Sequence, residues 1–128
     1  MEYVIYILYA LVIFLVVKRF MSVKGIKNIS TAELKTELQD KNKQFVDVRT
    51  PVEFQRNKIK EFKNIPLHTI AKSATDQLAR DKEVVVICQS GMRSQKAAKV
   101  LKKLGFTNVT NVKGGMSAWV KHDTKIKK

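Results

Sequence analysis

The stretch EVVVIC, residues 83–88, constrains the fold of this chain more than any other feature. Four β-branched residues follow one another without a polar position between them. This is the pattern of a strand that is buried on both faces. Such strands belong to parallel sheets that helices cover on each side. The segment therefore predicts an α/β domain with a central strand at Glu83–Cys88.

The rest of the chain fits this prediction, because short apolar segments alternate with helical ones, as in a parallel sheet. Two capping boxes, Ser30 with Glu33 and Thr50 with Glu53, mark the first residues of two helices. We expect helices over about 31–40, from 51 onward, over 70–78 and over 94–104, and further strands over 44–48, 64–66 and 109–112. After the last strand, Gly114-Gly115 turns the chain into a short helix.

The N-terminal segment is an unbroken apolar run, Tyr3–Val17, closed by Lys18-Arg19. About 20 apolar residues span a bilayer as a helix, so this run is slightly short. Phe20 and Met21 extend it, and the two basic side chains can snorkel to the headgroups. We therefore expect one transmembrane helix that meets the lipid bilayer through residues 3–20.

A cleaved signal peptide and a buried core helix are the alternatives for this run. No positive charge precedes it and no small-residue cleavage site follows it, which disfavours a signal peptide. The lysines after the run predict that the following domain is cytoplasmic. The expected organisation is an anchor at 1–21, a basic linker at 22–28, one domain at 29–121 and a basic tail at 122–128.

The formal net charge is +14, from 25 Lys and Arg against 11 Asp and Glu, and this excess favours anionic partners. The lysines are spread along the chain and no nucleic-acid-binding module is recognisable, so nucleic acid is not the expected partner. One cysteine excludes an internal disulfide. With only His68 and His122 beside it, no zinc-site spacing is present.

The single cysteine, Cys88, stands where the central strand ends and a helix begins. In an open parallel sheet, ligands bind beyond the carboxyl ends of the strands. Gly91 allows a tight turn, and the N–H groups at the start of the next helix form a nest for an anion. Together with Arg93, this field favours a reactive thiolate. The simpler alternative is that Cys88 is a small buried hydrophobic residue.

Three motifs in order resemble the rhodanese-like (thiosulfate sulfurtransferase-like) domain family. CQSGMRS, residues 88–94, is similar to the active-site loop. FVDVRTPVEF (45–54), with NIPL (64–67), resembles the first signature of the family, and LGFTNVTNVKGGMSAW (104–119) resembles the second. The resemblance covers about 26–120. The whole chain is similar to small rhodanese proteins with an N-terminal membrane anchor.

The resemblance implies a rhodanese-like α/β fold and a sulfurtransferase. Cys88 takes a sulfane sulfur from thiosulfate or a persulfide, becomes a persulfide, and passes the sulfur to a thiol, to cyanide or to an acceptor protein. No cofactor or metal is implied. The amides of the loop cradle the outer sulfur, and Arg93 holds an anionic donor. The loop residues are Gln89, Ser90, Gly91, Met92, Arg93 and Ser94, and the supporting residues are Asp47, Arg49, Gly114, Gly115 and Met116.

Two other activities compete with this one. A persulfide carrier or a recruitment module at the membrane would load sulfur or bind a partner without turnover. The related phosphatases and arsenate reductases have one more residue than the four between Cys88 and Arg93. The chain also departs from the family where Gln89 replaces a frequent Arg, which disfavours an anionic donor such as thiosulfate. Asn57-Lys58-Ile59 replaces Gly-His-Ile, Glu61-Phe62 replaces Gly-Ala, and Lys58 partly restores the positive charge.

Overall fold

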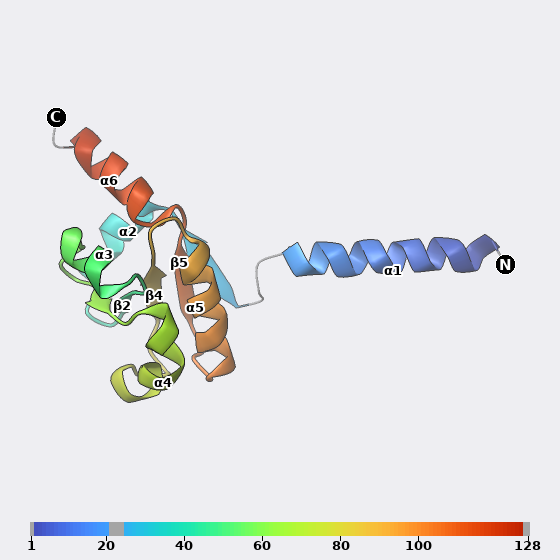
Figure 1. The fold of residues 1–128 in the computed structure, drawn as a ribbon, viewed down its shortest axis with the longest axis horizontal. Coiled ribbons are helices and arrows are strands. Elements are labelled where there is room, and N and C mark those ends of the chain that lie inside the picture. Colours follow the sequence, from blue (N-terminus) through green and yellow to red (C-terminus); the bar gives the residue numbers. More distant parts are fainter. Residues whose placement is uncertain (1, 21–24, 127–128) are drawn as a thin grey trace.

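The computed structural model describes residues 2–20 and 25–126. Residues 25–126 form a five-stranded parallel sheet with helices on both faces (Figure 1), which confirms the predicted α/β class. The elements are α1 (Glu2–Phe20), β1 (Ile26–Ile29), α2 (Thr31–Glu37), β2 (Gln44–Asp47), α3 (Pro51–Arg56), β3 (Lys63–Asn64), α4 (Leu67–Gln77), β4 (Val84–Ile87), α5 (Met92–Lys103), β5 (Val109–Val112) and α6 (Gly115–Ile126). The strand order is β1-β5-β4-β2-β3, so β4 is the central strand of the sheet.

Strand β4 is the middle of the core, because it pairs with β2 on one side and β5 on the other. All four of its residues are fully buried. Val84 and Val86 belong to the core cluster that includes residues of α4 and α5, whereas Val85 and Ile87 belong to the opposite cluster with residues of α2 and α6. The apolar run therefore has no polar position because both of its faces are covered.

Both expected capping boxes are present at the starts of α2 and α3. The Ser30 hydroxyl accepts from the amide of Glu33, and the Thr50 hydroxyl accepts from the amide of Glu53. Each glutamate carboxylate accepts in return from the amide of its cap residue. Pro51 at the first position of α3 costs no hydrogen bond, because that N–H has no partner within a helix.

Several element limits differ from the sequence prediction. Residues 26–28, expected as linker, belong to β1, which pairs with β5 from Ile26 opposite Val109. A four-residue strand with two polar positions has too little pattern to be recognised without its partner. β3 lies at Lys63–Asn64 rather than at 64–66, and α4 begins three residues early, after Pro66. Helix α6 reaches Ile126, and residues 21–24 and 127–128 lie outside the described residues.

The prediction that residues 3–20 cross the bilayer is corrected. In the part of the chain that the structure describes, no helix has both the length and the apolar character needed to span a membrane. The uninterrupted apolar part of α1, Tyr3–Val17, extends about 22 Å at 1.5 Å per residue. A hydrocarbon core is about 30 Å thick. The described side chains of α1, residues 2–17, are exposed.

Candidate active site

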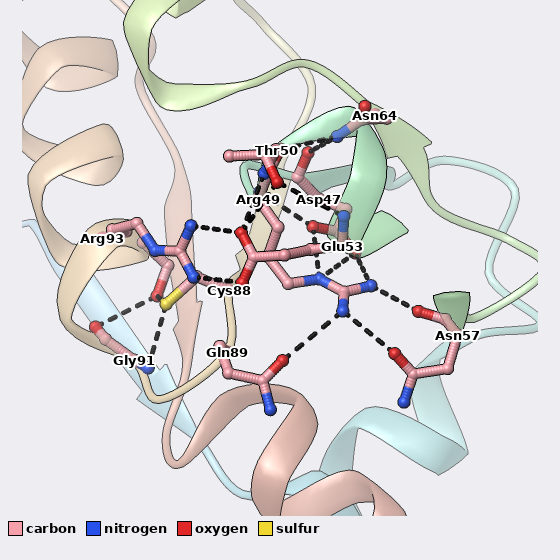
Figure 2. A network of polar contacts seen from close by, with 11 residues as sticks. Asp47, Arg49, Thr50, Glu53, Asn57, Asn64, Cys88, Gln89, Gly91 and Arg93 are labelled. Atoms are coloured by element: carbon pink, nitrogen blue, oxygen red, sulfur yellow. Dashed lines mark hydrogen bonds and ion pairs between the residues drawn. The ribbon is translucent and has the colours of Figure 1, made fainter. Parts of the chain in front are cut away.

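Cys88 lies directly after β4, is fully buried, and is followed by a three-residue loop that enters α5. Gly91, with φ of 102°, takes a left-handed conformation that side chains disfavour. This turn lets the Gly91 amide donate to the Cys88 Sγ at 2.9 Å (Figure 2). A donor aimed at the sulfur favours any negative charge that is placed on it during a reaction. The first N–H groups of α5 also lie at this N-terminal end of the helix, and they have no acceptor within the helix.

A buried polar chain continues from the sulfur toward the edge of the sheet. The Ser94 hydroxyl lies 3.4 Å from Sγ and donates to Asn111 Oδ1 on β5. The Asn111 amide in turn donates to Asn28 Oδ1 on β1 at 3.1 Å. Neither asparagine was predicted as a site residue. The sequence signal for Asn111 was a polar residue in the short strand VTNV, but its pairing with Ser94 is known only from the fold.

Arg49 is a buried cation whose hydrogen bonds are all internal. Its Nε donates to both Asp47 oxygens at 3.0 Å, and its Nη2 donates to Asp47 Oδ2 at 2.8 Å. Nη2 also donates to the Asn57 carbonyl, and Nη1 donates to Asn57 Oδ1 and Gln89 Oε1. All five N–H groups of the guanidinium therefore have an acceptor. Arg49 braces the wall of the site and has no donor left for a substrate.

Arg93, the predicted anion holder, is paired with a carboxylate. Its Nη1 and Nη2 donate to the two oxygens of Glu53 at 2.6 and 2.8 Å (Figure 2). Glu53 also accepts from the amide and the hydroxyl of Thr50 at its own helix start. The hydrogen bonds from Arg93 are the main cause that lowers the pKa of Glu53 to about 2, and the same carboxylate raises the pKa of Arg93. The sequence predicted Glu53 only as a helix cap.

These groups surround a polar pocket of about 500 Å³, lined by Arg49, Glu53, Arg56, Asn57 and Gln89. Gln89 is fixed across it, because its amide donates to Ser117 Oγ at 3.1 Å while its oxygen faces Arg49. Lys58 does not belong to this lining. Its Nζ lies 5.2 Å from the ring centroid of Phe54. The positive charge lost at Gln89 is therefore not restored by Lys58 at the pocket wall.

The start of α6 packs against the loop that follows Cys88, and Gly115 makes the close approach. A Cβ on Gly115 would come within 2.2 Å of the Cys88 carbonyl oxygen. Because that space is left open, the amides of Met116 and Ser117 donate to the carbonyls of Cys88 and Gln89 at 2.8 and 3.0 Å. The Met116 side chain is buried in the core rather than at the pocket rim.

The fold thus brings together most of the predicted site residues: Asp47, Arg49, Cys88, Gln89, Gly91, Arg93, Ser94 and Gly115. Ser90 of the loop and Met92, the first residue of α5, are exposed, Met92 to 76%. Gly114 lies just before α6: a Cβ there would meet the Ala118 side chain at 2.8 Å, and its amide nitrogen lies 3.4 Å from where a Cβ on Gly91 of the loop would stand. Among the side chains that the structure describes, those of residues 2–17 and 25–120, no three His, Cys, Asp or Glu form a group that could hold a metal ion.

Comparison with known proteins agrees with this geometry. The family described as the rhodanese-like domain matches residues 30–122. A putative sulfurtransferase of Bacillus subtilis is 42% identical over 95 residues, which are 73% of this chain and 90% of that protein. A sulfurtransferase of Allochromatium vinosum is 36% identical over 81 residues, 63% of this chain and 75% of that protein. The crystal structure of a rhodanese-like domain protein from Staphylococcus aureus, 37% identical, superposes with a TM-score of 0.67 over 73% of this chain and 90% of that one.

Proposed function

This chain belongs to the rhodanese-like domain family, and we propose that it is a sulfurtransferase that works through a persulfide on Cys88. The relatives named as sulfurtransferases make catalytic sulfur transfer the first expectation. The observation that carries the proposal is the Gly91 amide, 2.9 Å from the sulfur at the start of α5. It supports a thiolate as nucleophile and leaves the following amides near the place where an outer sulfur would be added.

The reaction needs two displacements at sulfur. The Cys88 thiolate attacks the sulfane sulfur of the donor, the S–S bond of the donor breaks, and its electron pair leaves with the departing thiolate or sulfite. The acceptor then attacks the outer sulfur of the Cys88 persulfide, and the electron pair of that S–S bond returns to Cys88. No oxidant or reductant is consumed. The role of the protein is to hold the thiolate and to stabilise charge on the added sulfur.

Intact-mass measurement tests this proposal directly. The full chain is incubated with a sulfur donor, its mass is read, and cyanide is then added while thiocyanate is measured. We expect the mass of one sulfur atom to be gained on Cys88 and lost again with turnover, and Cys88→Ser to gain nothing. Loading without turnover would favour a persulfide carrier. Absence of loading from every donor would refute the sulfur chemistry.

The number of loop residues also favours sulfur over phosphate or arsenate. Four residues separate Cys88 from Arg93, and Glu53 occupies two N–H groups of that arginine. A tetrahedral oxyanion needs a cradle with uncompensated donors. Hydrolysis of an aryl phosphate at a rate that falls in Cys88→Ser would contradict this preference.

The location of the domain in the cell is also a proposal. A single thiol persists where the surroundings are reducing, so we propose that the domain is cytoplasmic. Protection of the domain from a protease added to intact cells is the expected result, and its digestion there would overturn the proposal.

A further inference from the structure

The arginines near the site differ in the N–H donors and the uncompensated charge that they can offer to a substrate. Arg49 has all of its N–H groups engaged, and Asp47 balances its charge. Arg93 keeps N–H groups, but Glu53 balances its charge through two short hydrogen bonds. Both arginines are therefore neutralised from within the protein; Arg49 lines the polar pocket, and Arg93 is joined to the pocket wall through Glu53.

Glu53 is held in this role by its own helix. Its carboxylate accepts from the Thr50 amide at 3.1 Å and from the Thr50 hydroxyl at 3.0 Å, in addition to the two bonds from Arg93. A carboxylate with four donors does not swing away to release the arginine without losing its helix cap. The charge of Arg93 is thus permanently balanced by Glu53, so the pair offers no net positive charge that would attract a compact dianion.

Arg56 is the third cation, and it is arranged differently. It is exposed on α3 and makes no ion pair with another described residue. It lines the polar pocket and also an adjoining shallow, largely apolar hollow formed with Pro51, Val52 and Gln55. Val52, 66% exposed, supplies apolar surface beside this guanidinium. A cation next to an apolar surface fits an organic group that ends in a carboxylate.

We propose that the sulfur donor of this site is an organic persulfide that carries a carboxylate, and that Glu53 discriminates against thiosulfate. The proposal rests on the sulfurtransferase function proposed above. Thiosulfate places two negative charges on one compact group, beside a thiolate and two arginines whose charges Asp47 and Glu53 already balance. The protonated form of an organic persulfide, R–S–SH, presents an uncharged outer sulfur to Cys88, and its carboxylate, several bonds away, would be held by Arg56 in the lining of the polar pocket.

The transfer from such a donor is balanced. The Cys88 thiolate forms a bond to the outer sulfur of R–S–SH while the S–S bond of the donor breaks. The electron pair leaves on R–S⁻, and the proton stays on the outer sulfur, so the product is the Cys88 persulfide. Oxidation states are exchanged between two sulfur atoms, and no further reactant is needed.

Steady-state kinetics with cyanide as acceptor test the proposal on the full chain. The donors are thiosulfate and two persulfides of similar size, those of 3-mercaptopropionate and of 2-mercaptoethanol, which differ in the carboxylate. We expect the highest kcat/KM for the mercaptopropionate persulfide and the lowest for thiosulfate. In Arg56→Gln, the KM of the carboxylate donor should rise about tenfold, the value of one charge-assisted hydrogen bond, while the neutral donor is unaffected.

Glu53→Gln tests the discrimination from the other side. It releases the charge of Arg93, so kcat/KM for thiosulfate should rise about tenfold, and the ratio of persulfide to thiosulfate use should fall. Glu33→Gln is the matched control, because Glu33 closes the same kind of capping box at the start of α2, where it contacts only Ser30 and Thr36. Glu33→Gln should change neither kcat/KM for thiosulfate nor the ratio of persulfide to thiosulfate use.

The outcomes separate this inference from the proposed function. Thiosulfate use by the unaltered chain that equals persulfide use, or no gain in Glu53→Gln, would overturn the inference and leave the sulfurtransferase intact. Equal use of both persulfides, unchanged in Arg56→Gln, would overturn the role of the carboxylate. A chain that loads sulfur from none of the three donors would refute the function itself.

Discussion

Replacing Gly115 by alanine should both destabilise the domain and disable Cys88, because the start of α6 lies against the catalytic loop. The added Cβ would stand 2.2 Å from the Cys88 carbonyl oxygen and 2.9 Å from two backbone carbons, where ordinary contacts begin at 3.4 Å. The two backbones must therefore separate by more than an ångström. Such a shift breaks the hydrogen bonds from Met116 and Ser117 to the loop carbonyls, now 2.8 and 3.0 Å long.

The expected loss combines two terms. The left-handed conformation, with φ of 54°, costs an alanine about 1–2 kcal/mol. Each lost hydrogen bond costs about 1 kcal/mol. The free energy of unfolding should thus fall by about 3–4 kcal/mol, out of about 5–15 kcal/mol for a typical domain. Urea denaturation followed by the fluorescence of the single tryptophan, Trp119, measures this loss.

Gly105→Ala is the matched control. Gly105 also has a positive φ, 97°, but a Cβ there meets only the Arg80 side chain, at 3.8 Å. This variant should lose only about 1–2 kcal/mol and should load sulfur like the parent chain, whereas Gly115→Ala should load it slowly even where it is folded. Equal losses of stability in the two variants, with normal sulfur loading in both, would refute the close packing of α6 on the loop.

Three further predictions concern Asp47, Ser94 and Glu53, and Glu37→Ala serves as the control for the first. Asp47→Ala leaves the buried guanidinium of Arg49 without its counter-charge and should cost about 3–5 kcal/mol in urea denaturation. Glu37→Ala, which removes a partner of the more accessible Lys43, should cost about 1 kcal/mol or less. Ser94→Ala leaves Asn111 Oδ1 buried without its hydroxyl donor and should lower the free energy of unfolding by about 1–3 kcal/mol, whereas a neutral result would show that water replaces the hydroxyl. The pKa of Glu53 is depressed to about 2, below its value of about 4.3 in the unfolded chain. The ionised Glu53 therefore makes its full contribution to the free energy of unfolding above about pH 4.3, and this contribution is lost as the pH falls toward 2. Glu53→Gln should therefore flatten the fall of Tm between about pH 5 and 2, and a slope equal to that of the parent chain would contradict the paired carboxylate.

Much of the domain was predictable because its signals are local. The capping boxes at Ser30 and Thr50 use side chains three residues apart, and both are present as expected. The apolar strand at 83–88 required two covered faces, and β4 has them. The strand β1 was missed because its main support is pairing with β5, about 80 residues away in the sequence.

The length of the N-terminal apolar run was the point at which local reasoning failed. Hydropathy described its side chains correctly, since residues 2–17 are exposed and largely apolar. The length of helix available to cross a bilayer was overestimated, because Lys18, Arg19 and the residues after them were counted as part of it. A prediction from composition accepts a few charged residues at the end of an apolar run, whereas the continuous apolar length of the helix ends where they begin.

By itself, the sequence determined the alternation of helices and strands after β1 and the position of the candidate nucleophile, because a doubly buried strand, a cysteine and a tight glycine turn follow one another along the chain. Only the tertiary structure decided the electrostatics of the site. Glu53 reads as a helix cap and Arg93 as an anion holder, and they are 40 residues apart. They form one neutral pair because the parallel sheet brings the ends of β2 and β4 to the same edge. Charge neutralisation depends on distance in space, which no local pattern records.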